Sequence, residues 1–235
     1  LPYLQLSGAE EENPAMGWRA LRLSLDRQAL MKTQARALLD AAAGRRLSIM
    51  FPMVSEPWEF DEAKALFEAQ IAWMRSQKKA VPCRIDYGVM LEVPALAEVL
   101  DILLPKIDFI SVGTNDLTQF LFAADRGDPR LADRYDWLSP AILRFLRRVA
   151  KEAKAANVPV RLCGEMGGRT LEAMALIGIG IEALSITPAA VGPVKAMVRS
   201  LDAKAIGDKM DELLQKPPIN MRKALGDWAK KRGVV

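Results

Sequence analysis

The stretch YGVMLEVPALAEVLDILLPKIDFISVGTND, residues 87–116, contains two short apolar runs, 87–92 and 108–113, on either side of a longer segment. Continuous apolar character without in/out alternation predicts strands that are buried on both faces of a parallel sheet. Polar residues stand where each run stops: Glu92 ends the first, and Asn115 and Asp116 follow the second. The pattern therefore predicts buried strands that each deliver polar side chains to one edge of a sheet.

Three further runs, 47–53, 159–163 and 183–186, resemble these two. Helices with recognisable starts lie between the runs: Ser139 and Thr187 each precede a proline, and Thr170 opens a helix that we expect Gly178 to end as a C′ glycine. Alternation of strands and helices indicates either a doubly wound sheet or a (β/α) barrel. A closed barrel needs eight strands in about 250 residues, and only about five are evident here.

Composition excludes several classes of protein. The chain of 235 residues contains no histidine, so no imidazole of this chain can act as a base, a metal ligand or a phosphoryl acceptor. Its two cysteines stand far apart, which fits a cytoplasmic protein without disulfides. The net charge of +4 comes without a basic, aromatic-rich stripe, and no apolar run approaches the ~20 residues that span a bilayer. We expect neither nucleic acid nor membrane as a partner.

The carboxylates at the predicted strand ends suit a hard cation. Active sites of α/β sheets and barrels lie at the carboxyl ends of the strands. Mg²⁺ takes one or two protein carboxylates and completes its shell with water and substrate phosphate, and Glu92 and Asp116 fit that role. The alternative is that each carboxylate only caps the helix that follows it.

Three other features are candidates for the same edge. Arg126 lies in the long connection between Leu117 and Ser139, where its guanidinium could hold a phosphate or belong to a solvated charge cluster. Arg19 and Arg22 precede a helix and leave the same choice. Cys163 ends a strand before a glycine-rich turn, so its thiol is either a proton donor or a small packing residue. Cys83 precedes its strand and is expected on the opposite rim.

Taken together, these residues resemble the phosphoenolpyruvate-utilising enzymes, and among them most closely Enzyme I of the bacterial phosphotransferase systems. Within that group, the sequence looks like the nitrogen-regulatory branch. The resemblance covers roughly residues 1–200. It rests on seven motifs in the family's order, which are EENP…GWRALR (11–22), IMFPM (49–53), GVMLEVPA (88–95), SVGTNDLTQ (111–119), DRG (125–127), LSP (138–140) and LCGE (162–165).

The resemblance implies a role for each candidate residue. Glu92 and Asp116 would hold Mg²⁺. Asn115, the Asp116 backbone, Arg22 and Arg126 would hold the phosphate of phosphoenolpyruvate. Cys163 would protonate C3 of the enolate to give pyruvate. The implied fold is a (β/α)8 TIM-type barrel of the phosphoenolpyruvate/pyruvate-binding kind, truncated at its N-terminal side, with residues 1–200 as the barrel portion and 201–235 as a helical extension of the same domain.

The resemblance also implies partners. The phosphoryl group would pass to a histidine on a separate N-terminal domain and from there to a small phosphocarrier protein, in a protein that forms a homodimer. Because this chain contains neither that histidine nor the family's first βα units, it is expected to be a fragment that is inactive alone and prone to self-association. Two alternatives remain, a Mg²⁺-dependent pyruvate-enolate lyase or aldolase and a non-catalytic dimerisation module.

Overall fold

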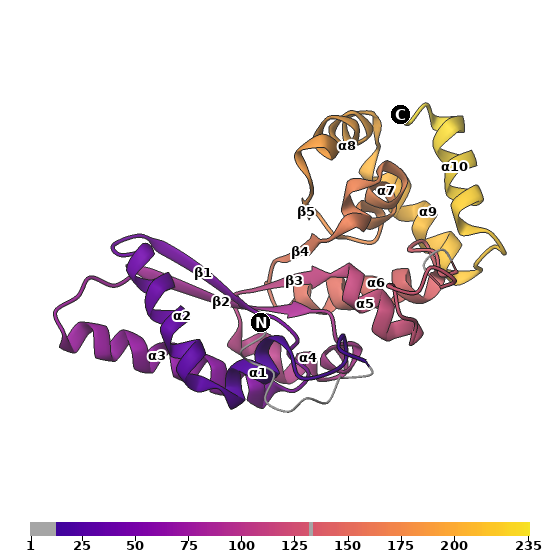
Figure 1. Ribbon diagram of the computed structural model, residues 1–235. Helices are drawn as coiled ribbons and strands as arrows, with labels where there is room; N and C mark the ends of the chain where they lie inside the picture. The colour runs from indigo at the N-terminus through magenta and orange to yellow at the C-terminus, as the bar shows by residue number, and fades with distance from the viewer. Residues whose placement is uncertain (1–12, 132–133) are drawn as a thin grey trace.

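The computed structural model of the protein describes residues 13–131 and 134–235 (Figure 1). Glu11 and Glu12, which open the first motif, lie outside the described residues. Five parallel strands form one sheet in the order β1-β2-β3-β4-β5. They are β1 (Arg46–Phe51), β2 (Arg84–Leu91), β3 (Phe109–Gly113), β4 (Val160–Cys163) and β5 (Ala183–Ser185). The five strands predicted from the apolar runs are therefore confirmed.

The strand order separates the two predicted architectures. Each strand pairs with the next one along the chain, so the winding never reverses. A doubly wound sheet reverses its order at a switch point, whereas neighbouring strands of a (β/α) barrel follow each other in this way. Within the described residues β1 and β5 each pair with one strand only. The order is that of consecutive barrel strands, and closure of the barrel stays a prediction.

Helices connect the strands and follow the last one. Before β2 these are α1 (Ala20–Asp26), α2 (Gln28–Ala41) and α3 (Pro57–Ser76). Between β2 and β4 lie η2 (Pro94–Val99), α4 (Leu100–Leu103), η3 (Leu104–Lys106), α5 (Thr114–Phe122) and α6 (Pro140–Ala155). After β4 come η4 (Glu165–Gly168), α7 (Thr170–Gly178), α8 (Pro188–Ser200), α9 (Ala203–Gln215) and α10 (Met221–Arg232).

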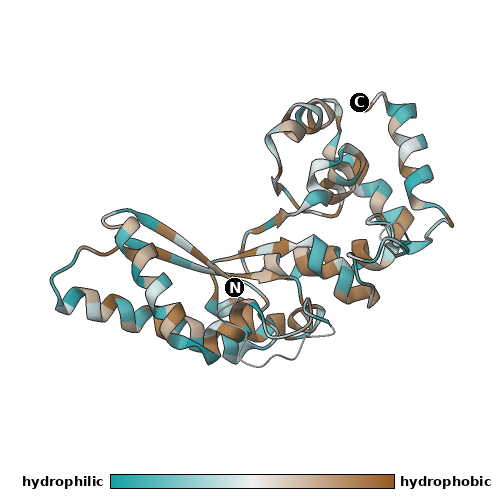
Figure 2. Cartoon of the chain, viewed as in Figure 1, coloured by the Kyte–Doolittle hydropathy of each residue, from teal (hydrophilic) through white to brown (hydrophobic). Residues whose placement is uncertain are grey.

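One face of the sheet is apolar and packs against helices. Phe51 and Tyr87 on this face contact Phe60 and Phe67 of α3, with ring centroids of Phe51 and Phe67 5.6 Å apart. Figure 2 shows apolar residues concentrated in the strands and the helices beside them, while α10 is largely hydrophilic. The buried strand residues on this face are Ile49, Phe51, Tyr87, Val89, Leu91, Ile110, Val112 and Leu162.

The other face of the sheet is mixed in character and less buried. Ser48, Arg84, Arg161 and Ser185 are exposed on it. The prediction of strands buried on both faces is therefore wrong at these four positions, whereas Asp86 and Gly88 on the same face are buried and Met50, Met90 and Phe109 are half-buried.

Helix boundaries confirm some predictions and correct others. Ser139 caps α6, its hydroxyl accepting a hydrogen bond from Ala141 N at 3.3 Å. Gly178 lies inside α7 rather than after it, and Gly180 is the residue with positive φ, at +97°. Gly178 instead allows close helix packing, because a Cβ there would lie 2.6 Å from Met210 Cγ of α9. On α8, which begins after Thr187 as predicted, Val194 is buried but Val191 and Val198 are exposed.

The long connection after β3 also differs from the prediction. Its first part is helical, because α5 runs from Thr114 to Phe122 and buries Leu117. A left-handed residue, Ala123, ends this helix. At the C-terminus the predicted helical extension consists of α9 and α10, on either side of Pro217 and Pro218. Among the described residues, no helix combines the length and the apolar character needed to cross a membrane.

Candidate functional site

The carboxyl ends of β2, β3 and β4 lie side by side. Leu91 pairs with Val112, and Gly113 pairs with Cys163. Glu92 follows β2 directly and packs against the end of β3, since a Cβ on Gly113 would lie 2.7 Å from Glu92 Oε2. Gly113 is therefore small because a carboxylate occupies the space beside it. The strand order brings three predicted site segments to one edge.

Glu92 is held inside the protein as a buried carboxylate. Only 4% of the residue is exposed, and its Oε1 accepts a hydrogen bond from Met53 N at 2.7 Å. Burial raises the pKa of Glu92, and the neighbouring charge of Asp116 adds to that increase, while the Met53 amide and two arginines oppose it. Burying a carboxylate without a cation is unfavourable. The environment of Glu92 therefore favours the arrival of positive charge.

Asp116 lies in the first turn of α5 and is paired with two arginines. Arg19 Nη2 lies 2.9 Å from Asp116 Oδ2, and Arg126 Nη2 lies 3.3 Å from Oδ1. The Asp116 side chain is buried, and both guanidiniums are partly exposed. The backbone of Arg126 is fixed as well, because its N–H donates to Oε1 of the buried Gln119 at 3.1 Å. Two cations and two carboxylates thus share one small region.

Asn115 precedes Asp116 and carries an unpaired acceptor. Its Oδ1 is buried and has no hydrogen-bond partner among the described residues. The turn after β4 packs closely on this end of α5: Gly164 has a φ of +107°, and a Cβ there would lie 2.4 Å from Thr114 Oγ1. Buried polar atoms normally have partners. An unpaired oxygen at this position fits a site that is completed by a ligand.

Cys163 lies at the same edge, at the end of β4. Its Sγ donates to Val112 O at 3.2 Å and accepts from Ser111 Oγ at 3.5 Å, and the residue is half-buried. The other cysteine, Cys83, is exposed and precedes β2, at the amino ends of the strands. The expected separation of the two thiols is confirmed, while the catalytic role of Cys163 stays a prediction.

Arg22 does not take part in this ion-pair cluster. It lies in α1, where its Nη1 donates to Met16 O at 2.7 Å and its Nη2 to Ser55 Oγ at 3.5 Å. Arg19, at the N-cap of α1, makes the contact with Asp116 instead. Both arginines belong to one sequence motif, and nothing in the motif tells which of them points to the site. The sequence pattern left both arginines as candidates and the family resemblance selected Arg22, whose phosphate role stays a prediction.

The oxygen atoms at this edge fit a magnesium ion. No cluster of three or more metal-ligating His, Cys, Asp or Glu side chains occurs among the described residues. Mg²⁺ does not require one, because it binds through one or two carboxylates together with water and substrate phosphate. Glu92 and Asp116 supply two buried carboxylates, and Asp116 Oδ1 has no hydrogen-bond partner. The donor set is compatible with Mg²⁺.

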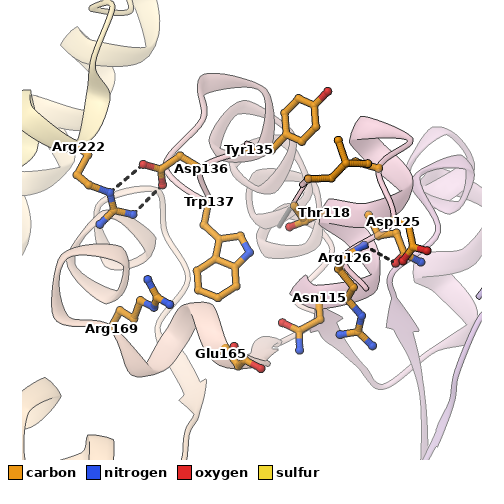
Figure 3. Close-up of a pocket in the computed structure, with 13 residues that line it drawn as sticks. Asn115, Thr118, Asp125, Arg126, Tyr135, Asp136, Trp137, Glu165, Arg169 and Arg222 are labelled. Atoms are coloured by element: carbon orange, nitrogen blue, oxygen red, sulfur yellow. Dashed lines mark hydrogen bonds and ion pairs between the residues drawn. The ribbon is translucent and has the colours of Figure 1, made fainter. Parts of the chain in front are cut away.

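A cavity of about 510 Å³ adjoins this cluster. Asn115 and Arg126 line one end, and Asp136 and Arg222 are joined by hydrogen bonds at the other (Figure 3). The indole of Trp137 lies between them, with the guanidinium of Arg169 4.8 Å from its ring centre. Specific small-molecule sites commonly have such volumes, with a few convergent polar groups.

Comparison with known proteins identifies the family. Residues 1–203 match the model of the PEP-binding domain of PEP-utilising enzymes. The chain belongs to this family. The family resemblance inferred from the seven motifs is thereby confirmed, and the match includes every candidate site residue at the strand edge.

Curated relatives of this family member share a considerable fraction of its residues. A Salmonella typhimurium protein named "Phosphoenolpyruvate-dependent phosphotransferase system" is 43% identical over 86% of this chain, which covers 27% of that protein. Proteins named "Phosphoenolpyruvate-protein phosphotransferase" from Staphylococcus carnosus and Bacillus subtilis are 38% and 37% identical over 92% and 91% of this chain. The chain covers 37% of each of these two, so it spans between 27% and 37% of the length of these relatives.

Proposed function

We propose that this PEP-binding domain binds phosphoenolpyruvate together with Mg²⁺ and supports transfer of the phosphoryl group to a histidine on a separate N-terminal domain. Pyruvate is the second product, and the phosphohistidine passes its group to a small phosphocarrier protein. The observation that carries this proposal is the buried Asp116 carboxylate, flanked by Arg19 and Arg126 and close to the buried Glu92. The names of the relatives support the same reaction.

The arginines provide the anion-binding half of the site. Planar guanidiniums bind phosphate with paired hydrogen bonds, and they stabilise the charge that spreads over the oxygens as the P–O bond loosens. Arg19 and Arg126 are both partly exposed while their partner is buried, so each can turn toward a ligand without leaving a buried position. Asn115 supports the phosphate beside them, and Arg22 is a further candidate.

Glu92 and Asp116 would hold the magnesium ion. When bound, Mg²⁺ supplies positive charge that offsets the charge of the phosphate and of the enolate oxygen. The residues themselves fix two oxygen ligands at the edge of a rigid sheet. The Met53 amide orients Glu92, and the N-terminal turn of α5 orients Asp116.

Cys163 would complete the reaction as an acid. Transfer breaks the bond between phosphorus and the ester oxygen and leaves the enolate of pyruvate. The Cys163 thiol then gives its proton to C3, forming the methyl group of pyruvate, and the thiolate regains a proton from water. The hydrogen bond from Cys163 Sγ to Val112 O at 3.2 Å supports this role, since it keeps the thiol at this edge, and the half-buried position leaves room for the thiol to turn.

The proposed reaction requires a further domain that carries the phosphoryl-accepting histidine. No residue among the 235 is a histidine, so the phosphoryl acceptor must come from outside this chain. We further propose a homodimer in the cytoplasm as the working form. No observation specifically favours a lyase or aldolase, or a non-catalytic dimerisation module.

Substitution of the two carboxylates tests the function. Glu92→Ala and Asp116→Ala should each remove the Mg²⁺-dependent part of phosphoenolpyruvate binding, measured by calorimetry. Glu165→Gln is the matched control, because this exposed carboxylate lines the adjacent cavity but ends no strand of the cluster. Unchanged affinity in both alanine variants would overturn the assignment.

A further inference from the structure

Arg222 connects the C-terminal helix to the cavity beside the site. It is the second residue of α10 and lies beyond residue 203, where the family match ends. Its Nε and Nη2 donate to the two carboxylate oxygens of Asp136 at 2.8 and 2.7 Å, and Nη2 also donates to Glu172 Oε1 at 2.6 Å. One guanidinium thus joins two carboxylates from different parts of the fold.

Glu172 makes the position of Arg222 important for stability, because Arg222 is its ion-pair partner. It lies in α7 and is only 1% exposed. Among the described residues, no other side chain forms a hydrogen bond or an ion pair with it. A buried carboxylate without its partner is strongly unfavourable. Glu172 therefore fixes the position of Arg222, and Arg222 in turn is available to fix Asp136.

Asp136 fixes the cavity wall between α5 and α6. Its Oδ1 accepts from Leu138 N at 2.9 Å, and its carbonyl oxygen accepts from Ser139 N at 2.9 Å. The hydrogen bonds from Arg222 hold the pKa of Asp136 below its usual range, so the carboxylate stays charged. The residues on either side face the cavity. The Arg222–Asp136 ion pair, referred to below as the clamp, therefore fixes the backbone that carries Tyr135 and Trp137.

Tyr135 and Trp137, on either side of Asp136, connect this wall to the candidate site. Tyr135 stacks on Phe122 at the end of α5, with ring centroids 4.5 Å apart and nearly parallel planes. The same helix carries Asn115 and Asp116 at its other end. Trp137 lies beside Arg169, whose guanidinium has no hydrogen bond or ion pair among the described residues. Figure 3 shows the wall running from the Arg222–Asp136 pair to Asn115 and Arg126.

We propose that Arg222 is a positioning residue. From the C-terminal helix it holds the wall that carries Tyr135 and Trp137, and it thereby couples the packing of α10 to ligand binding at Asn115 and Arg126. This inference rests on the proposed function, because the ligand is phosphoenolpyruvate with Mg²⁺. The clamp itself can be tested without that ligand.

The test uses a double variant, Arg222→Met/Glu172→Met, which removes the buried Glu172 charge together with its arginine, so that only the partly exposed Asp136 loses its partner. Hydrogen exchange at the Leu138 amide should become faster, because its acceptor is no longer held. Affinity for phosphoenolpyruvate with Mg²⁺ should fall by at least about 5-fold, the lower end of typical coupling between sites. Arg222→Lys should rescue only part of both effects, because an ammonium cannot reproduce the two parallel bonds to Asp136.

Arg147→Met is the matched control. It breaks an ion pair of 2.7 Å between Arg147 of α6 and Asp211 of α9, away from the cavity. Neither exchange nor affinity should change in this variant. Unchanged exchange in the double variant, faster exchange with unchanged affinity, or an equal loss in Arg147→Met would each overturn the positioning role. A wild-type chain that binds no phosphoenolpyruvate would contradict the proposed function, and the exchange comparison alone would then decide the role of Arg222.

Discussion

Arg19 and Asp116, 97 positions apart in the chain, form an ion pair in which Nη2 lies 2.9 Å from Oδ2. The pair brings a residue from the N-cap of α1 to the first turn of α5. A cation bound at Asp116 would compete with this arginine for the charge of the same carboxylate. Release of Arg19 toward the phosphate would then accompany metal binding. In the ligand-free site, the Arg19 guanidinium balances the charge of Asp116 in place of the metal ion.

Replacement of the two neighbouring arginines separates their roles. Arg19→Met should weaken phosphoenolpyruvate binding by roughly 10- to 100-fold, because hydrogen bonds to charged groups contribute about 1.5–3 kcal/mol. Arg22→Met should cost less, since in this structure that guanidinium binds Met16 O, Gly17 O and Ser55. Calorimetric titration of both variants makes the comparison. A larger loss in Arg22→Met would reinstate Arg22 as the main phosphate ligand.

Glu92→Gln should make the metal-free protein more stable at neutral pH. Burial raises the pKa of Glu92 in the folded state above the ordinary value of about 4.3. Folding then becomes less favourable as pH rises through the interval between the two values, because the buried carboxylate must ionise. Glutamine has no such cost and can still accept from Met53 N. The difference in Tm between variant and wild type should grow as pH rises above about 4.3 and then level off.

Mg²⁺ provides the control for this pH dependence. It should raise the Tm of the wild type but not of Glu92→Gln, because the amide is a poorer ligand than a carboxylate for a hard cation. A variant that loses stability relative to the wild type as pH rises would show that Glu92 is stabilised as an anion by the protein alone.

Cys163 can be tested in the chain as it is. An acid that protonates C3 of the enolate must, in reverse, remove a proton from the methyl group of pyruvate. Wild-type protein with Mg²⁺ should therefore exchange the methyl protons of pyruvate in D₂O, followed by NMR. Cys163→Ala should slow this exchange by about 10²- to 10⁴-fold, while Cys83→Ala, at the other end of the strands, should not. Equal rates in wild type and Cys163→Ala would reduce the thiol to a packing residue.

The sequence predicted the strands well because their apolar runs are short and separate. It also predicted the strand-end position of Glu92 and Cys163, since parallel strands place their carboxyl ends together. It could not decide between Arg19 and Arg22, because a choice between two arginines of one motif depends on how the start of α1 lies relative to Asp116. The role of Gly178 was missed for a similar reason, since the residue that requires it, Met210, is distant in sequence.

Arg222 had no signal in the sequence at all. It stands in a polar helix beyond the last motif, and only the packing of α10 brings it to Asp136 and Glu172. The buried Glu172 could have indicated a missing cation, because a carboxylate within the apolar pattern of α7 needs a partner. The identity of that partner requires the tertiary structure.

The open edges of the sheet predict self-association. Strands β1 and β5 each leave one edge without a partner among the described residues, and Val191 and Val198 are exposed on α8. Unpaired strand edges and exposed apolar side chains favour contact with other chains. Sedimentation velocity at micromolar concentration should show dimers or larger species. A well-folded monomer would contradict this expectation and the proposed homodimer through this domain.

Titration of the wild-type chain with phosphoenolpyruvate, in the presence of Mg²⁺ and in the presence of EDTA, tests the central claim most directly. Calorimetry should show saturable binding of one ligand per chain with Mg²⁺ and at least about 10-fold weaker binding without it, since Glu92 and Asp116 would hold the ion and its charge would offset that of the phosphate. Equal affinity under both conditions would contradict the metal site, and no binding under either would contradict the proposed function itself.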